Sequence, residues 1–115
     1  MATLVDLTMH ENNDEVVAVT LTASGSENLG EVTALEFVLK PSTCESDADA
    51  DALVLTSAPG QGITILTQSA TTITAEVAVP AAALAETYER AWRLDALTGT
   101  ARRTALYGTV TVIDL

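Results

Sequence analysis

Apolar and polar residues alternate in short runs along most of this chain, a period-two pattern typical of β-strands with one face in a core. The alternation is clearest in residues 71–79, where Ile73, Ala75, Val77 and Val79 share one face. The same pattern recurs often enough to predict strands at residues 3–9, 15–23, 33–40, 52–57, 62–67, 71–79, 88–96 and 103–113. In the third of these, Leu35, Phe37 and Leu39 are expected to face inward and Glu36 and Lys40 outward.

The segments between these runs are rich in turn-forming residues. Gly, Pro, Ser, Asn and Asp cluster in residues 23–30, 41–51 and 57–62, and Gly99 marks a short hairpin turn. Only residues 80–86 favour a helix, with Pro80 at its first position. The sequence therefore predicts an all-β fold, an Ig-like antiparallel β-sandwich of about seven to eight strands with one short connecting helix.

The size and composition of the chain fit a single domain. It has 115 residues, of which 48% are apolar, so we expect one domain, residues 1–115, with a real core. A single cysteine excludes an internal disulfide. The net charge of −11 disfavours binding to nucleic acid or to anionic membranes. The first fifteen residues lack a basic segment and are acidic, so we expect no signal peptide and synthesis in the cytoplasm.

The residues that could carry chemistry are few. Asp47, Asp49 and Asp51 alternate as Ca²⁺ ligands can, but the glycine and glutamate of an EF-hand loop are missing, so we expect an acidic loop without a specific metal. His10 is the only histidine and is interpreted as an exposed loop residue, and Cys44 as an unreactive thiol. We expect no catalytic residue, no cofactor and no enzymatic activity; a small hydrolase would need a site that the sequence does not reveal.

Tyr88 stands at the start of a predicted strand, directly after the predicted helical corner. This is the setting of the tyrosine corner of immunoglobulin-like sandwiches, in which the phenol hydrogen-bonds to the backbone a few residues upstream. We therefore expect Tyr88 to be a buried structural residue. Trp92 is four residues after Tyr88, so its side chain lies on the same face of the strand and is expected in the core. Arg90 stands where antibody domains carry their second cysteine.

The second half of the chain resembles a known family in the order of its segments, which read GITI, TTITAEVAV, PAAALAETY, RAWRLDALTG and ALYGTVTV. This order is similar to that of the Ig-like N-terminal domain of phage baseplate upper proteins, and of small Ig-like virion modules in general. The matching positions are residues 62–65, 72–79, 81–88 and Gly108. The resemblance implies an Ig-like virion module with no catalytic site.

Four of the five basic residues, Arg90, Arg93, Arg102 and Arg103, lie close together near the last hairpin. Residues 1–75 have a net charge of −10 and residues 76–115 of −1. One interpretation is structural: Arg93 pairs with cross-strand carboxylates, and Arg102 and Arg103 protect an edge strand. The other is that these four arginines form a protein interface with an acidic partner, because the guanidinium group binds carboxylates in a bidentate manner.

The sequence thus predicts a non-enzymatic phage virion structural accessory protein, present in multiple copies as a capsid decoration or a tail or baseplate component. Its partners would be other virion proteins and copies of itself. The alternative is a free-standing Ig-like binding module for carbohydrate or a cell-surface protein. A flat apolar patch beside the arginine hairpin would favour assembly, and exposed aromatic residues at one end of the sandwich would favour the alternative.

Overall fold

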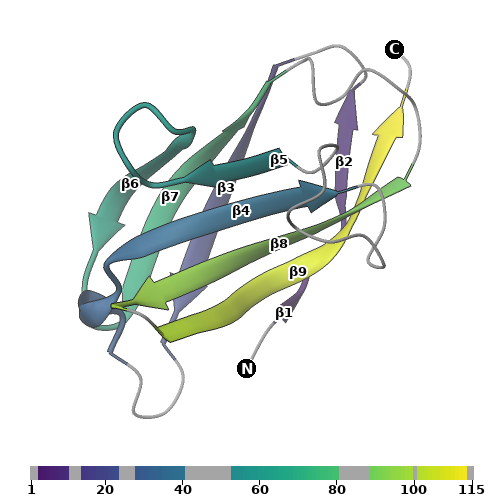
Figure 1. The fold of residues 1–115 in the computed structure, drawn as a ribbon. Helices are drawn as coiled ribbons and strands as arrows, with labels where there is room; N and C mark the ends of the chain where they lie inside the picture. The colour runs from purple at the N-terminus through teal and green to yellow at the C-terminus, as the bar shows by residue number, and fades with distance from the viewer. Residues whose placement is uncertain are drawn as a thin grey trace.

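The protein folds as two β-sheets packed face to face (Figure 1). The computed structural model describes residues 3–10, 14–23, 28–40, 53–80, 89–99 and 101–113. The larger sheet contains β1 (Thr3–Leu4), β2 (Leu7–His10), β4 (Ala34–Lys40), β5 (Leu53–Thr56), β8 (Glu89–Thr98) and β9 (Ala101–Ile113), and the smaller contains β3 (Glu15–Thr22), β6 (Ile63–Gln68) and β7 (Thr72–Val79). The predicted all-β sandwich is confirmed.

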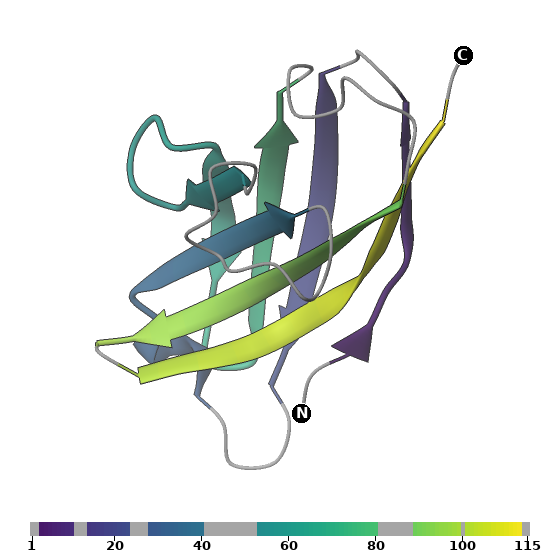
Figure 2. The same ribbon diagram turned by 45° about the vertical axis from the view of Figure 1, so that its right-hand side comes forward.

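The strand order is β1-β9-β8-β4-β5 in the larger sheet, with β2 also paired to β9, and β3-β7-β6 in the smaller sheet. Figure 2 shows the strands of the two sheets crossing obliquely. The sequence predicted an antiparallel sandwich, but β1 and β2 both run parallel to β9, so the larger sheet is mixed. A 3₁₀-helix, η1 (Leu29–Glu31), precedes β4. The helix predicted at residues 80–86 lies outside the described residues, apart from Pro80.

The core forms where the alternating side chains of the two sheets meet. All four residues predicted to face inward from β7 are at most 1% exposed, and so are Leu35, Phe37 and Leu39 of β4. Trp92 of β8 is buried as predicted, and its ring stacks on that of Phe37 with 5.7 Å between centroids. Burying these apolar faces supplies the main driving force for folding.

One predicted strand, residues 3–9, is divided into β1 and β2 by a break at Val5 and Asp6. The indole Nε1 of Trp92 donates a hydrogen bond of 2.9 Å to the Val5 carbonyl. That carbonyl occupies the place where a Cβ on Gly108 would stand, so the chain can approach β9 here only because residue 108 is glycine. The break is therefore caused by a tertiary contact rather than by the local sequence.

The hairpin between β8 and β9 turns at Gly99, which has a φ of 60° and so adopts a conformation that glycine tolerates best. Thr98 pairs with Ala101, and the register continues to Asp95 opposite Thr104. A register shift then places Leu94 opposite Leu106. This irregularity sets which β9 residues lie on the outer face of the larger sheet.

Candidate interaction surface

A single row of side chains crosses the outer face of the larger sheet from one edge to the other. The strand register aligns Leu4, Tyr107, Arg93, Val38 and Val54, contributed by β1, β9, β8, β4 and β5 in turn. Leu4 is 60% exposed, and Tyr107 and Val54 are each 44% exposed, whereas Val38 is only 1% exposed and separates Val54 from the exposed pair Leu4 and Tyr107. Large apolar side chains on an exposed sheet face are a common feature of protein interaction sites.

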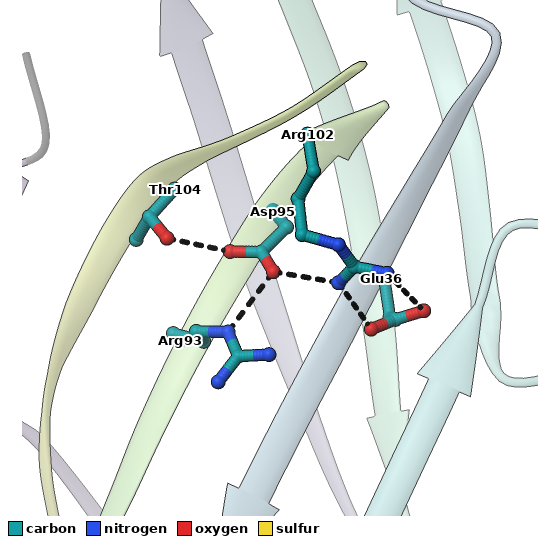
Figure 3. Close-up of polar contacts among 5 residues, drawn as sticks. All are labelled: Glu36, Arg93, Asp95, Arg102 and Thr104. Atoms are coloured by element: carbon teal, nitrogen blue, oxygen red, sulfur yellow. Dashed lines mark hydrogen bonds and ion pairs between the residues drawn. The ribbon is translucent and has the colours of Figure 1, made fainter. Parts of the chain in front are cut away.

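The next row on this face contains a buried carboxylate, that of Asp95, which has no exposed surface. Its Oδ2 accepts hydrogen bonds from Arg93 Nε at 2.9 Å and from Arg102 Nη1 at 2.8 Å. Its Oδ1 accepts a hydrogen bond from the Thr104 hydroxyl at 2.8 Å (Figure 3). A buried carboxylate is tolerated in a protein when its charge is paired and its oxygens are hydrogen-bonded, as both are here.

Arg102 connects this carboxylate to a second one. Its Nη1 lies 2.6 Å from Oε1 of Glu36, and its Nη2 lies 3.4 Å from Oε2 (Figure 3). The guanidinium of Arg102 on β9 therefore reaches over β8 to a residue of β4, tying three strands together. We refer to Arg93, Asp95, Arg102, Glu36 and Thr104 as the outer-face cluster.

The hydrogen bonds of the outer-face cluster favour the ionised forms of Asp95 and Arg102. Burial alone would raise the pKa of Asp95, but the hydrogen bonds from Arg93, Arg102 and Thr104 outweigh it, and the pKa lies below its ordinary value of 3.8. The hydrogen bonds to Glu36 and Asp95 raise the pKa of Arg102. Two arginines and two acidic residues thus form a cluster with no net formal charge at pH 7.

Arg102 keeps donors for a further partner. Its side chain is 44% exposed, and its contacts to Glu36 and Asp95 use three of its five N–H groups. The remaining two can bind a carboxylate of another molecule without breaking the outer-face cluster. The surface therefore combines two apolar side chains, Leu4 and Tyr107, with the guanidinium of Arg102, which is held in place by the cluster and has two N–H groups that neither Glu36 nor Asp95 uses.

The four arginines predicted as one interface do not share a face. Arg93 and Arg102 meet at Asp95 on the outer face. Arg90, 8% exposed, has the strand phase of Trp92 and pairs in register with Val110. Arg103 lines the space between the two sheets. The structural interpretation predicted carboxylate pairing for Arg93, which does contact Asp95, a residue of its own strand. It predicted edge protection for Arg102 and Arg103, and both lie in the part of β9 that pairs only with β8 in the described residues.

The sequence interpretation missed Asp95, Glu36, Leu4 and Tyr107 as members of one surface. A signal existed for one contact: a two-residue turn at Gly99 places Asp95 opposite Thr104 in a regular hairpin. The pairing of Leu4 with Tyr107 could not be read from the sequence, because it depends on β1 joining β9 across nearly the whole chain.

His10 was predicted to be an exposed loop residue, and this is wrong. It ends β2 and is partly buried, and its backbone N–H and ring Nδ1 lie 3.0 and 3.2 Å from Oε1 of Glu15. These contacts tie β2 to the start of β3. Tyr88, Cys44 and the acidic residues Asp47, Asp49 and Asp51 lie outside the described residues, so the expectations for them stay predictions.

Within the described part of the chain, no group of three or more His, Cys, Asp or Glu side chains is placed to hold a metal ion. In the same residues, no helix is long and apolar enough to cross a membrane. No protein-family model matches the chain, and a search of curated proteins found no match. Any function must therefore be argued from the surface itself.

Proposed function

We propose that this protein is a non-enzymatic structural component of a phage virion, attached in multiple copies to the capsid, tail or baseplate through the outer face of its larger sheet. The observation that carries the proposal is the exposed apolar pair Leu4 and Tyr107 on the same sheet face as Arg102. Specific protein interfaces combine an apolar centre with arginine and with polar groups at the rim. The virion is proposed as the partner because the sequence resembles Ig-like virion modules.

The strand order supports an Ig-like form of the sandwich. In immunoglobulin domains, strands B, E and D lie in one sheet and strands G, F and C in the other, and some domains have an additional strand beside C. The orders β3-β7-β6 and β9-β8-β4-β5 follow this arrangement when the strands are taken in chain order. The assignment remains part of the proposal, since Tyr88 lies outside the described residues.

The distribution of aromatic residues argues against the alternative, a carbohydrate-binding module. Such modules present exposed aromatic faces to the sugar. Phe37 and Trp92 are buried, and Tyr107 is the one exposed aromatic residue in the part of the chain that the structure describes. Tyr107 lies in the middle of a sheet face and not at an end of the sandwich.

The proposal is tested by attachment to purified particles that lack the protein. We expect wild type to co-sediment with the particles and Leu4→Glu to lose at least about tenfold in retention, because a charge enters the apolar contact. Leu66→Glu is the matched control, since Leu66 of β6 is 55% exposed on the smaller sheet; its retention should equal that of wild type.

Raising the salt concentration should weaken attachment where Arg102 pairs with a partner carboxylate at the rim. The proposal is wrong if wild type does not bind particles at all. If Leu4→Glu and Leu66→Glu are retained on the particles to the same extent, the outer face of the larger sheet is not the attachment site.

A further inference from the structure

The smaller sheet has an unusual edge at β3. Within the described residues, the four sheet edges differ. β5 is four residues long, and β6 has a register shift between Ile65 and Thr67. The edge formed by β1 and β2 is broken and begins only at Leu106, so residues 101–105 of β9, which include Arg102 and Arg103, form the rest of that edge. β3 is eight residues long, pairs with β7 without a shift, and contains no lysine, proline or glycine. Short strands, breaks, bulges and lysines are the usual means by which proteins prevent further pairing at an edge. β3 has none of them.

The register shows which backbone groups of β3 face outward from the sheet. The Ala23 N–H donates to the Thr71 carbonyl at 2.8 Å, which continues the β3–β7 ladder by one residue. Residues in an antiparallel ladder alternate between those bonded to the partner and those directed away from it. The odd-numbered residues of β3 therefore bond to β7, and the N–H and C=O groups of Val16, Ala18, Thr20 and Thr22 point to the open edge.

A cavity lined by both polar and apolar side chains lies directly beside this edge. Its volume is about 980 Å³, and it extends between β3 and the first half of β9. β3 is the strand of the smaller sheet on the side of β1, β2 and β9 (Figures 1 and 2). The partly exposed apolar side chains in its lining include Val17, Leu106 and Ala105. The cavity is large enough for several side chains of an extended segment.

The charges around β3 indicate what kind of segment would fit. Glu15 begins β3, and Glu76 of β7 pairs in register with Ala18 on the outer face of the smaller sheet. Glu31 and Arg103 both lie in the cavity lining, so the excess of negative charge is at Glu15 and Glu76 rather than inside the cavity. A segment with basic residues on its outer side would be attracted by these carboxylates, and by the net charge of −11.

From these observations we infer that β3 is the acceptor for an extended segment of another protein, which pairs antiparallel to β3, points alternate apolar side chains into the cavity and places basic side chains over Glu76. Strand addition of this kind gains affinity from backbone hydrogen bonds and specificity from alternate side chains. A second copy of this chain fits less well. Its β3 is equally acidic, and its Val19 and Leu21 are already buried in its own core.

This surface is distinct from the outer face of the larger sheet, and the inference does not depend on the proposed function. The probe is a blocked nine-residue peptide that alternates lysine and valine, with lysine at both ends. Side chains opposite Val16, Ala18 and Thr20 point outward, so the lysines take those positions and their N–H groups bond to β3. Two control peptides carry N-methyl groups, one at all lysines and the other at all valines.

Amide hydrogen exchange reads out the result residue by residue. We expect saturating peptide to slow exchange at Val16, Ala18 and Thr20 by at least about tenfold, while the amides of Val17, Val19 and Leu21 are protected with or without peptide. The valine-methylated peptide should act like the parent peptide, and the lysine-methylated peptide should have no effect, because its N–H groups that face β3 are blocked.

Two variants of the protein complete the test. Ala18→Pro removes an N–H that faces the open edge and should abolish peptide binding, whereas Ala18→Thr keeps that N–H and should bind normally. If Ala18→Pro does not fold, the two methylated peptides decide the question alone.

Three results would overturn the inference. The first is the absence of any peptide-dependent protection along β3. The second is protection of Val16, Ala18 and Thr20 in the peptide-free monomer, which would mean that the chain covers its own edge. The third is protection that rises with protein concentration together with dimer formation, which would make a second copy the occupant.

Discussion

The polar groups of the outer-face cluster on the larger sheet have hydrogen-bond partners within the chain, whereas the backbone groups along the open edge of the smaller sheet have no partner strand in the described residues. In the outer-face cluster, each Asp95 oxygen is hydrogen-bonded although the residue is fully buried. Along β3, the N–H and C=O groups of four residues are directed to an edge that has no strand beside it in the described chain. The first region is complete without a partner, and the second can be completed only by water or by another strand. The difference predicts where substitutions change stability and where they change association.

The largest effect on stability is expected for Asp95→Ala, at about 3 kcal/mol. The substitution leaves Arg93 and Arg102 close together on the outer face without the carboxylate between them. Asp6→Ala is the control, because Asp6 is exposed although it also accepts two hydrogen bonds, from the N–H and the hydroxyl of Thr109. We expect it to cost about 1 kcal/mol or less. Urea unfolding measures both, and equal losses would contradict the special role of burial at Asp95.

Lowering the pH is expected to reduce the free energy of unfolding through Asp95 by less than Asp95→Ala does. Because the pKa of Asp95 is lowered in the folded protein, the unfolded chain binds the proton first as the pH falls. The stability that Asp95 contributes is therefore fully present above its ordinary pKa of 3.8 and is lost as the pH falls below it toward the folded value. The difference in unfolding free energy between wild type and Asp95→Asn isolates this residue from the other carboxylates. It should be constant at higher pH and shrink in that acidic range; a difference that does not change with pH would contradict the pairing.

The fold could be predicted from the sequence where the alternation of apolar residues is local. Ile73, Ala75, Val77 and Val79 of β7 are buried as their spacing indicates. The break at Val5 could not be predicted, because it depends on Trp92 and Gly108, about a hundred residues away. Local alternation gives strands, but it does not say which strand lies beside which.

The candidate surface was predictable only in part, for the same reason. The arginines were recognised from their clustering in the sequence, yet the consecutive residues Arg102 and Arg103 point to opposite sides of β9. Arg102 reaches Glu36, and Arg103 lines the cavity. The register shift between Leu94 and Asp95 also changes which β9 residue lies opposite Arg93, placing Tyr107 there. A bulge of this kind has no clear signal in a single sequence.

The smallest effect on stability is expected for Thr20→Lys on the β3 edge, within about 0.5 kcal/mol of wild type. Thr20 is exposed, and its backbone groups face away from β7, so no hydrogen bond of the fold is lost. Association should respond much more strongly. Near the isoelectric point of about 4.1, the repulsion between copies vanishes, and an unprotected edge can pair with other chains. Thr20→Lys places a charge on that edge and should reduce aggregation at this pH, as measured by light scattering.

Thr111→Lys adds the same charge at an exposed position of β9, which is paired on one side with β2 and on the other with β8. We expect it to aggregate at its own isoelectric point to the extent that we expect of wild type at pH 4.1. Equal protection by both lysines, each at its own isoelectric point, would mean that net charge and not the β3 edge governs association.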